Sequence, residues 1–151
     1  LPALLASEND IKSFSMTGQR RDLNREKFKL DNLVSVLNNP ESNANKNIKY
    51  LGNAMDIRSK LEQFHPSSEM ECLSKGRSDI VVIKRGKGPK SVFAIHNMTE
   101  NKINYQLDDY DLPELIDNDF NMKDFLASTK YNWKNISLDP FQVIWLGSLM
   151  K

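Results

Sequence analysis

The chain has 151 residues, enough for one domain or for a small domain and a piece of another. Its 21 basic and 20 acidic residues nearly cancel, so no strong field draws it to nucleic acid or to a membrane surface. One cysteine, Cys72, excludes an internal disulfide framework and predicts a cytoplasmic, reducing compartment. The chain has no initiator methionine, and its opening lacks the basic start of a signal peptide. We therefore expect a piece of a longer protein.

Leu1 to Ala6 is a short apolar run that ends in the polar residues Ser7-Glu8-Asn9-Asp10. Such a run predicts a strand buried on both faces, as in a parallel barrel. If it is the eighth strand of a barrel, the loop after it lies on the face where barrel active sites are built. This placement brings Asn9, Asp10 and the arginines that follow near a substrate.

The arginine loop, Thr17–Phe28, concentrates three arginines, one lysine and two carboxylates. Arginine is chosen where a planar fork must meet a carboxylate, a phosphate or sugar hydroxyl groups. Two interpretations follow from these residues alone. The loop is either a substrate-binding loop or an Arg–Asp network that pins the backbone.

Two helices are predicted after this loop. The first follows Lys29, with Asp31 as its N-cap, and it ends before Pro40 because the residue before a proline avoids helical dihedrals. The second runs from Ser42 to Phe64, with apolar residues along roughly one stripe. His65-Pro66-Ser67-Ser68 then breaks the helix and begins a predicted linker.

After Ser68 the hydrophobic pattern changes to a period of two, which predicts strands. The predicted strands are Met70–Ser74, Asp79–Arg85, Lys90–Met98, Lys102–Leu107, Phe125–Ala127, Asn135–Ser137 and Phe141–Leu146. Arg85-Gly86-Lys87-Gly88-Pro89 is typical of a hairpin connection. Regularly spaced strands with turn signals predict an antiparallel β-sandwich.

The other reactive residue types give weak signals. His65 and His96 have no second histidine or cysteine at ligand spacing, so no metal site is predicted. Cys72 is interpreted as a small buried hydrophobic residue of a strand. Trp133 and Trp145 could stack on sugar rings if exposed, but packing in a core is the favoured interpretation.

Several stretches, in this order, resemble the region after the last barrel strand in the sucrose phosphorylase-like enzymes of the α-amylase superfamily of glycoside hydrolases. They are Ser7-Glu8-Asn9-Asp10, Thr17-Gly18-x-Arg20-Arg21-Asp22-x-Asn24-Arg25, Phe64-His65-Pro66, Ser91–Thr99 and Leu138–Leu146. The resemblance covers nearly the whole chain. It implies an α+β fragment: the last strand and closing helices of a (β/α)8 barrel in residues 1–66, then an antiparallel β-sandwich C-terminal domain in residues 67–151.

The resemblance also implies a function for the longer protein. Such enzymes transfer glucose from an α-glucoside such as sucrose or glucosylglycerate to inorganic phosphate with retention of configuration, and give α-glucose 1-phosphate. Phosphate is a co-substrate, and no cofactor is implied. The catalytic carboxylates, about 5–5.5 Å apart in retaining enzymes, are expected before Leu1, so this chain alone should catalyse nothing.

By the same resemblance, Arg25 helps to bind the glucosyl ring, Asp22 orients Arg25, and Arg20 or Arg21 faces the acceptor or phosphate. An α-amylase-type hydrolase or a glucosyltransferase with the same architecture remains an alternative. So does a non-catalytic carbohydrate-binding sandwich. The oligomeric state stays open, a homodimer included.

Overall fold

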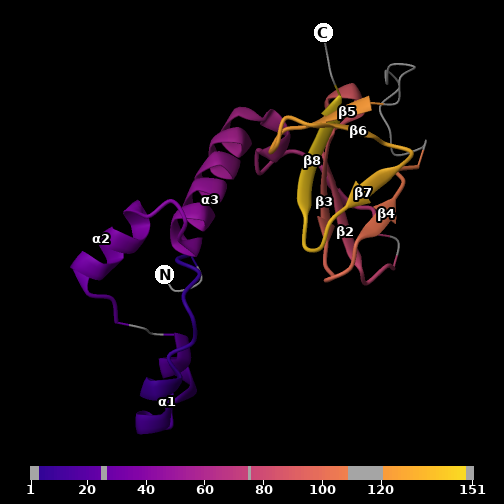
Figure 1. Ribbon diagram of the computed structural model, residues 1–151. Coiled ribbons are helices and arrows are strands. Elements are labelled where there is room, and N and C mark those ends of the chain that lie inside the picture. The colour runs from indigo at the N-terminus through magenta and orange to yellow at the C-terminus, as the bar shows by residue number, and fades with distance from the viewer. Residues whose placement is uncertain (1–3, 25–26, 75, 109–120, 149–151) are drawn as a thin grey trace. The chain divides into compact units, whose positions relative to one another are not determined.

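The computed structural model describes residues 4–24, 27–74, 76–108 and 121–148 (Figure 1). It divides into two compact units, Leu1–Met55 and Asp56–Lys151. We call them the helical unit and the sheet unit. The assignment of residues 1–66 to a barrel and 67–151 to a separate sandwich domain stays a prediction.

The helical unit contains α1 (Ile11–Thr17), the 3-10 turn η1 (Arg20–Asn24), α2 (Leu30–Asn38) and the first part of α3 (Asn43–Lys60). Both predicted helices are confirmed, with changes at their ends. Asp31 is not the N-cap of α2: Lys29 occupies that position without a side-chain hydrogen bond, and Asp31 lies in the first turn. A carboxylate there is favoured by the partial positive charge of a helix N-terminus.

Helix α3 begins where the sequence predicts and ends earlier. The Ser42 hydroxyl accepts a hydrogen bond from the backbone N–H of Asn45 at 3.1 Å, which satisfies one of the free donors of the first turn. The helix stops at Lys60, because Leu61 is extended, and the 3-10 turn η2 (Glu62–Phe64) follows. This departure from helical geometry lets Phe64 pack on Trp145 of the sheet.

Residues 4–6 form a turn, so the predicted strand is wrong over its described part, and residues 1–3 lie outside the described residues. An isolated strand leaves its backbone groups unpaired, and the described part of the helical unit offers no neighbouring strand. Instead, Leu5 is buried and the Leu4 carbonyl accepts a hydrogen bond from the Asn47 side chain at 2.7 Å.

The sheet unit is built from antiparallel strands. Its six-stranded sheet has the order β1-β2-β3-β8-β5-β6, and β4 and β7 form a second, two-stranded sheet (Figure 1). The bounds are β1 Met70–Cys72, β2 Ile80–Arg85, β3 Val92–Asn97, β4 Ile103–Tyr105, β5 Asn121–Asp124, β6 Lys130–Asn132, β7 Ile136–Leu138 and β8 Val143–Ser148. A short 3-10 turn, η3 (Gly88–Lys90), lies in the predicted hairpin between β2 and β3.

The two sheets share one hydrophobic core. Phe93, Ile95 and Ile144 of the large sheet are fully buried in the same cluster as Ile136 and Leu138 of the small sheet. A two-stranded ribbon alone is marginally stable in water, so burial against the large sheet accounts for its presence. The predicted α+β class and the antiparallel pairing are confirmed.

The predicted strand Phe125–Ala127 is wrong: these residues form a turn, and the strands β5 and β6 lie on either side of it. Asp124 is responsible for this turn. Its buried carboxylate accepts hydrogen bonds from the backbone N–H groups of Leu126 at 3.0 Å and Ala127 at 3.3 Å. Such side-chain-to-backbone bonds compete with strand pairing.

Candidate functional site

The arginine loop follows the short helix α1, whose N-cap is Asp10. The Asp10 carboxylate accepts hydrogen bonds from the Ser13 backbone N–H at 2.9 Å and the Ser13 hydroxyl at 2.6 Å. These hydrogen bonds hold the pKa of Asp10 below its usual range, and the bond from the Ser13 hydroxyl has the largest effect. The Asp10 backbone N–H also donates to the Leu23 carbonyl at 2.8 Å, which ties the start of α1 to η1.

A left-handed glycine turns the chain from α1 into η1. Gly18 has φ +66°, and its N–H donates to the Phe14 carbonyl at 2.8 Å, a common helix C-terminus. The Thr17 hydroxyl then donates to Asp22 Oδ2 and also accepts the Gln19 backbone N–H at 3.2 Å. Thr17 and Asp22 therefore close the turn that carries Arg20 and Arg21.

The structure describes two of the three predicted binding residues, Asp22 and Arg21, and their surroundings differ. Asp22 is mostly covered, and its bonded oxygen faces Thr17. The Arg21 Nε lies 4.0 Å from Asp22 Oδ1, but 64% of the Arg21 side chain stays exposed, so this ion pair adds little stability and leaves the guanidinium accessible. Arg25 lies outside the described residues. The contacts of Asp22 are those expected of a loop-pinning network, and the binding roles of Arg21, Asp22 and Arg25 stay predictions.

A cleft of about 870 Å³ lies in the helical unit beside this loop. Its walls come from residues 5–12, 27–29, 32–33, 36 and 42–44, and they combine apolar side chains such as Phe28 and Leu33 with Asp10 and Lys12. Arg21 and Asp22 are not part of its lining. Lys27 and Phe28, the last residues of the arginine loop, line the cleft together with Asp10, the N-cap of α1.

Sequence analysis gave no role to Thr17 and did not predict α1. The signal for the helix was present, because Asp10-x-x-Ser13 is a spacing at which an N-cap carboxylate meets the third helical residue. The pairing of Thr17 with Asp22 had no such signal. It depends on the turn at Gly18, which places two side chains five positions apart in contact.

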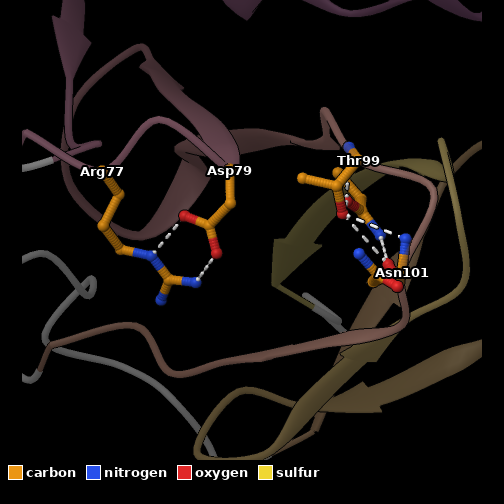
Figure 2. Close-up of polar contacts among 5 residues, drawn as sticks. Arg77, Asp79, Thr99 and Asn101 are labelled. Carbon is orange, nitrogen blue, oxygen red and sulfur yellow. Dashed lines mark hydrogen bonds and ion pairs between the residues drawn. The ribbon is translucent and has the colours of Figure 1, made fainter.

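A second polar cluster lies in the sheet unit, near the end of β3 (Figure 2). Asn97 is 2% exposed; its amide donates to the carbonyls of Asn101 at 2.7 Å and Asp139 at 2.8 Å. Its oxygen accepts the backbone N–H and the hydroxyl of Thr99, both at 2.9 Å. Every hydrogen-bonding position of the Asn97 side chain is thus used within the fold, which makes it a structural residue.

Arg77 and Asp79 form a two-pronged ion pair near this cluster (Figure 2). Hydrogen bonds from Arg77 lower the pKa of Asp79. The Arg77 guanidinium also lies 5.7 Å from the centre of the Tyr105 ring. With a carboxylate and an aromatic ring as partners, Arg77 is engaged inside the fold.

Cys72 and His96 are further described residues with reactive side chains. Within the described residues there is no group of three side chains suited to a metal ion. Cys72 is exposed, contrary to the prediction, because β1 is an edge strand with all three residues exposed; a hydrogen bond to Ser74 lowers the pKa of its thiol. Burial lowers the pKa of His96.

The two tryptophans are packed, as favoured. Trp133 is 4% exposed in the core, and the Trp145 ring lies against Phe64 with their centres 4.6 Å apart. Neither ring is a free platform for a sugar. No described helix is long and apolar enough to cross a membrane.

Comparison with known proteins links the chain to carbohydrate-active enzymes. It is 31% identical over 98 residues to a glucosylglycerate phosphorylase of Allomeiothermus silvanus, a match that covers 65% of this chain and 17% of that protein. No family model matches the chain.

Several solved structures share the fold of this chain. AmyP, crystallised with maltose, matches 74% of this chain and 23% of its own length with a TM-score of 0.57 and 16% identity. An Anoxybacillus α-amylase matches 75% of this chain and 25% of its own length, with a TM-score of 0.55 and 19% identity. A trehalose-6-phosphate hydrolase from Bacillus licheniformis matches 75% of this chain and 19% of its own length, with a TM-score of 0.53 and 16% identity. The chain thus spans a quarter or less of each of these proteins.

Proposed function

We propose that the chain is the C-terminal portion of a sucrose phosphorylase-like enzyme of the α-amylase superfamily and thus part of a retaining α-glucoside phosphorylase. The parent enzyme transfers glucose from glucosylglycerate or sucrose to inorganic phosphate. Its product is α-glucose 1-phosphate. The observation that carries the proposal is the 31% identity to a glucosylglycerate phosphorylase.

In this proposal the helical unit supplies one wall of the glucosyl pocket. Arg25 binds the sugar ring, and Asp22 orients the Arg25 side chain. Arg21 faces the phosphate, a role supported by its exposed guanidinium, because a planar fork matches phosphate oxygens. The catalytic carboxylates, the α-glucoside, the phosphate co-substrate and a cytoplasmic location belong to the same proposal.

The proposal divides the work between the two units. The packed tryptophans and the fully bonded Asn97 argue against a separate sugar-binding role for the sheet unit. We assign it to shielding the surface of the parent barrel. An α-amylase-type hydrolase or a glucosyltransferase is the second candidate, since the solved structures that share the fold include an α-amylase and a hydrolase.

The test uses the complete protein encoded by the gene. Incubated with glucosylglycerate or sucrose, it is expected to release glucose 1-phosphate only when inorganic phosphate is present. Release of free glucose at the same rate without phosphate would identify a hydrolase instead. A panel of other α-glucosides separates substrate choice from reaction type.

The role of Arg25 needs its own variant. Arg25→Ala should lower kcat/KM about 100-fold, the scale of a lost hydrogen bond from a charged group to the substrate. Arg58→Ala, which removes an exposed arginine from the end of α3, is the matched control and should leave kcat/KM unchanged. A normal rate for Arg25→Ala would remove Arg25 from the pocket without touching the phosphorylase assignment.

A further inference from the structure

The segment Leu61–Ser68 joins α3 to the first strand of the sheet, and we call it the joint. The sequence predicts that the helix continues to Phe64 and that a linker begins at His65-Pro66-Ser67-Ser68. The structure instead gives it internal order. The Phe64 N–H donates to the Leu61 carbonyl at 3.0 Å, and the Ser68 hydroxyl donates to the Glu62 carbonyl at 2.8 Å.

Arg85, the last residue of β2, donates hydrogen bonds to the backbone of the joint. Its Nε donates to the Gln63 carbonyl at 3.0 Å, and its Nη2 donates to the His65 carbonyl at 2.7 Å. Carbonyl groups at the end of a helical turn carry partial negative charge, and the His65 carbonyl also accepts the Ser68 backbone N–H at 2.9 Å. A guanidinium fork across two of them makes charge-assisted bonds in a fixed geometry.

Two packing contacts also hold the joint, one from β8 and one from the residue that follows β2. Phe64 lies against Trp145 of β8, with ring centres 4.6 Å apart. Gly86 approaches Gln63 so closely that an added Cβ would lie 2.9 Å from the Gln63 Cγ. Gly86 also has φ +81°, which an L-residue rarely adopts, so both its backbone and its lack of a side chain suit this contact.

We propose that Leu61–Ser68 is a fixed part of the sheet unit, in which Arg85 and Trp145 hold the residues after α3 against the sheet. This clamp needs no ligand, and it is independent of the catalytic role of the longer protein.

Hydrogen exchange measured by mass spectrometry on the complete protein tests this device. The peptide that covers Leu61–Ser68 is expected to be protected in the wild type. Arg85→Ala should accelerate its exchange about tenfold or more, while the peptide that covers β3 (Val92–Asn97) keeps its wild-type rate. Arg85→Lys keeps the charge without the fork and should give an intermediate rate.

Arg77→Ala is the matched control, since it removes an arginine that contacts Asp79 and Tyr105 and not the joint. It should leave the joint peptide unchanged. Phe64→Ala is a second variant that opens the clamp without altering the sheet itself. The proposal is overturned if the wild-type joint exchanges like an unstructured peptide, or if neither Arg85→Ala nor Phe64→Ala accelerates it. Loss of protection in β3 as well, in both variants, would also overturn the joint as a separate local device.

Discussion

The ring of Phe125 lies so close to Gly147 that a Cβ on this glycine would overlap the ring edge. Gly147 is in β8, the strand between β3 and β5, and it pairs with Val92 and Lys123. Gly147→Ala should therefore destabilise the sheet unit by about 1–3 kcal/mol, the usual cost of overpacking. Both tryptophans lie in the sheet unit, so urea unfolding followed by tryptophan fluorescence measures this unit.

The control is a glycine with free space around it. A Cβ at Gly52, within α3, would meet no atom within 4 Å, so Gly52→Ala should stabilise the helix by about 0.5–1 kcal/mol. Circular dichroism at 222 nm follows this helix during thermal unfolding. Equal effects of the two alanines would show that the Phe125 ring moves aside at little cost.

Asp124 should be the most sensitive charged residue of the sheet unit. It is 1% exposed, and its carboxylate accepts three backbone N–H groups, from Leu126, Ala127 and Trp145. Asp124→Ala leaves these donors unpaired and should cost on the order of 3 kcal/mol in urea unfolding. Asp124→Asn keeps one acceptor oxygen and should cost less. A cost below that of a typical surface substitution would contradict this role.

Asn97→Asp tests the polar cluster of Figure 2 with a change of one atom. The substitution replaces a donor group by an oxygen that faces the carbonyls of Asn101 and Asp139. We expect a loss of about 3 kcal/mol or more, since the new oxygen is buried against two acceptors. Asn135→Asp, at an exposed asparagine, should change the free energy of unfolding by less than about 0.5 kcal/mol.

The Arg77–Asp79 pair should make the stability of the sheet unit depend on acid pH. The pKa of Asp79 is lowered, mainly by hydrogen bonds from Arg77. A carboxyl group with a lowered folded pKa stabilises the fold above its unfolded pKa, near 3.8, and this contribution is lost as the pH falls through the folded value.

The measurement compares the wild type with Asp79→Asn in urea at several pH values. The wild type should be the more stable protein near neutral pH, and the difference should close as Asp79 becomes protonated. Because the pair is partly exposed, added salt should reduce the difference. A difference that stays constant from neutral pH to about pH 2 would show that the ion pair does not couple to folding.

Much of the fold could be predicted from local patterns. Alternating residues such as Val82 identified β2, because alternation records which face of a strand is buried, whereas β3 is buried on both faces. Proline and glycine signals marked the end of α2 and the hairpin after Arg85. The resemblance of the arginine loop to sucrose phosphorylase-like enzymes also came from residues close together in the chain.

Other features had no local signal. The strands β5 and β6 were missed because the turn between them depends on Asp124, which reaches the backbone of β8 21 positions away. Helix α3 ends at Lys60 because Phe64 packs against Trp145 and Arg85 donates hydrogen bonds to carbonyl groups of the joint. For the candidate site, the sequence singled out Arg21, Asp22 and Arg25, while only the structure paired Asp22 with Thr17.

Taken alone, the sequence determined the class of each main segment and the loop in which binding residues are predicted. Periodicity and turn residues act over a few positions, so the chain itself carries this information. The strand order, the turn at Asp124, the exposure of Cys72 and the clamp at the joint were decided by tertiary structure. Each of them depends on contacts between segments far apart in the chain, where burial and hydrogen bonding outweigh local propensity.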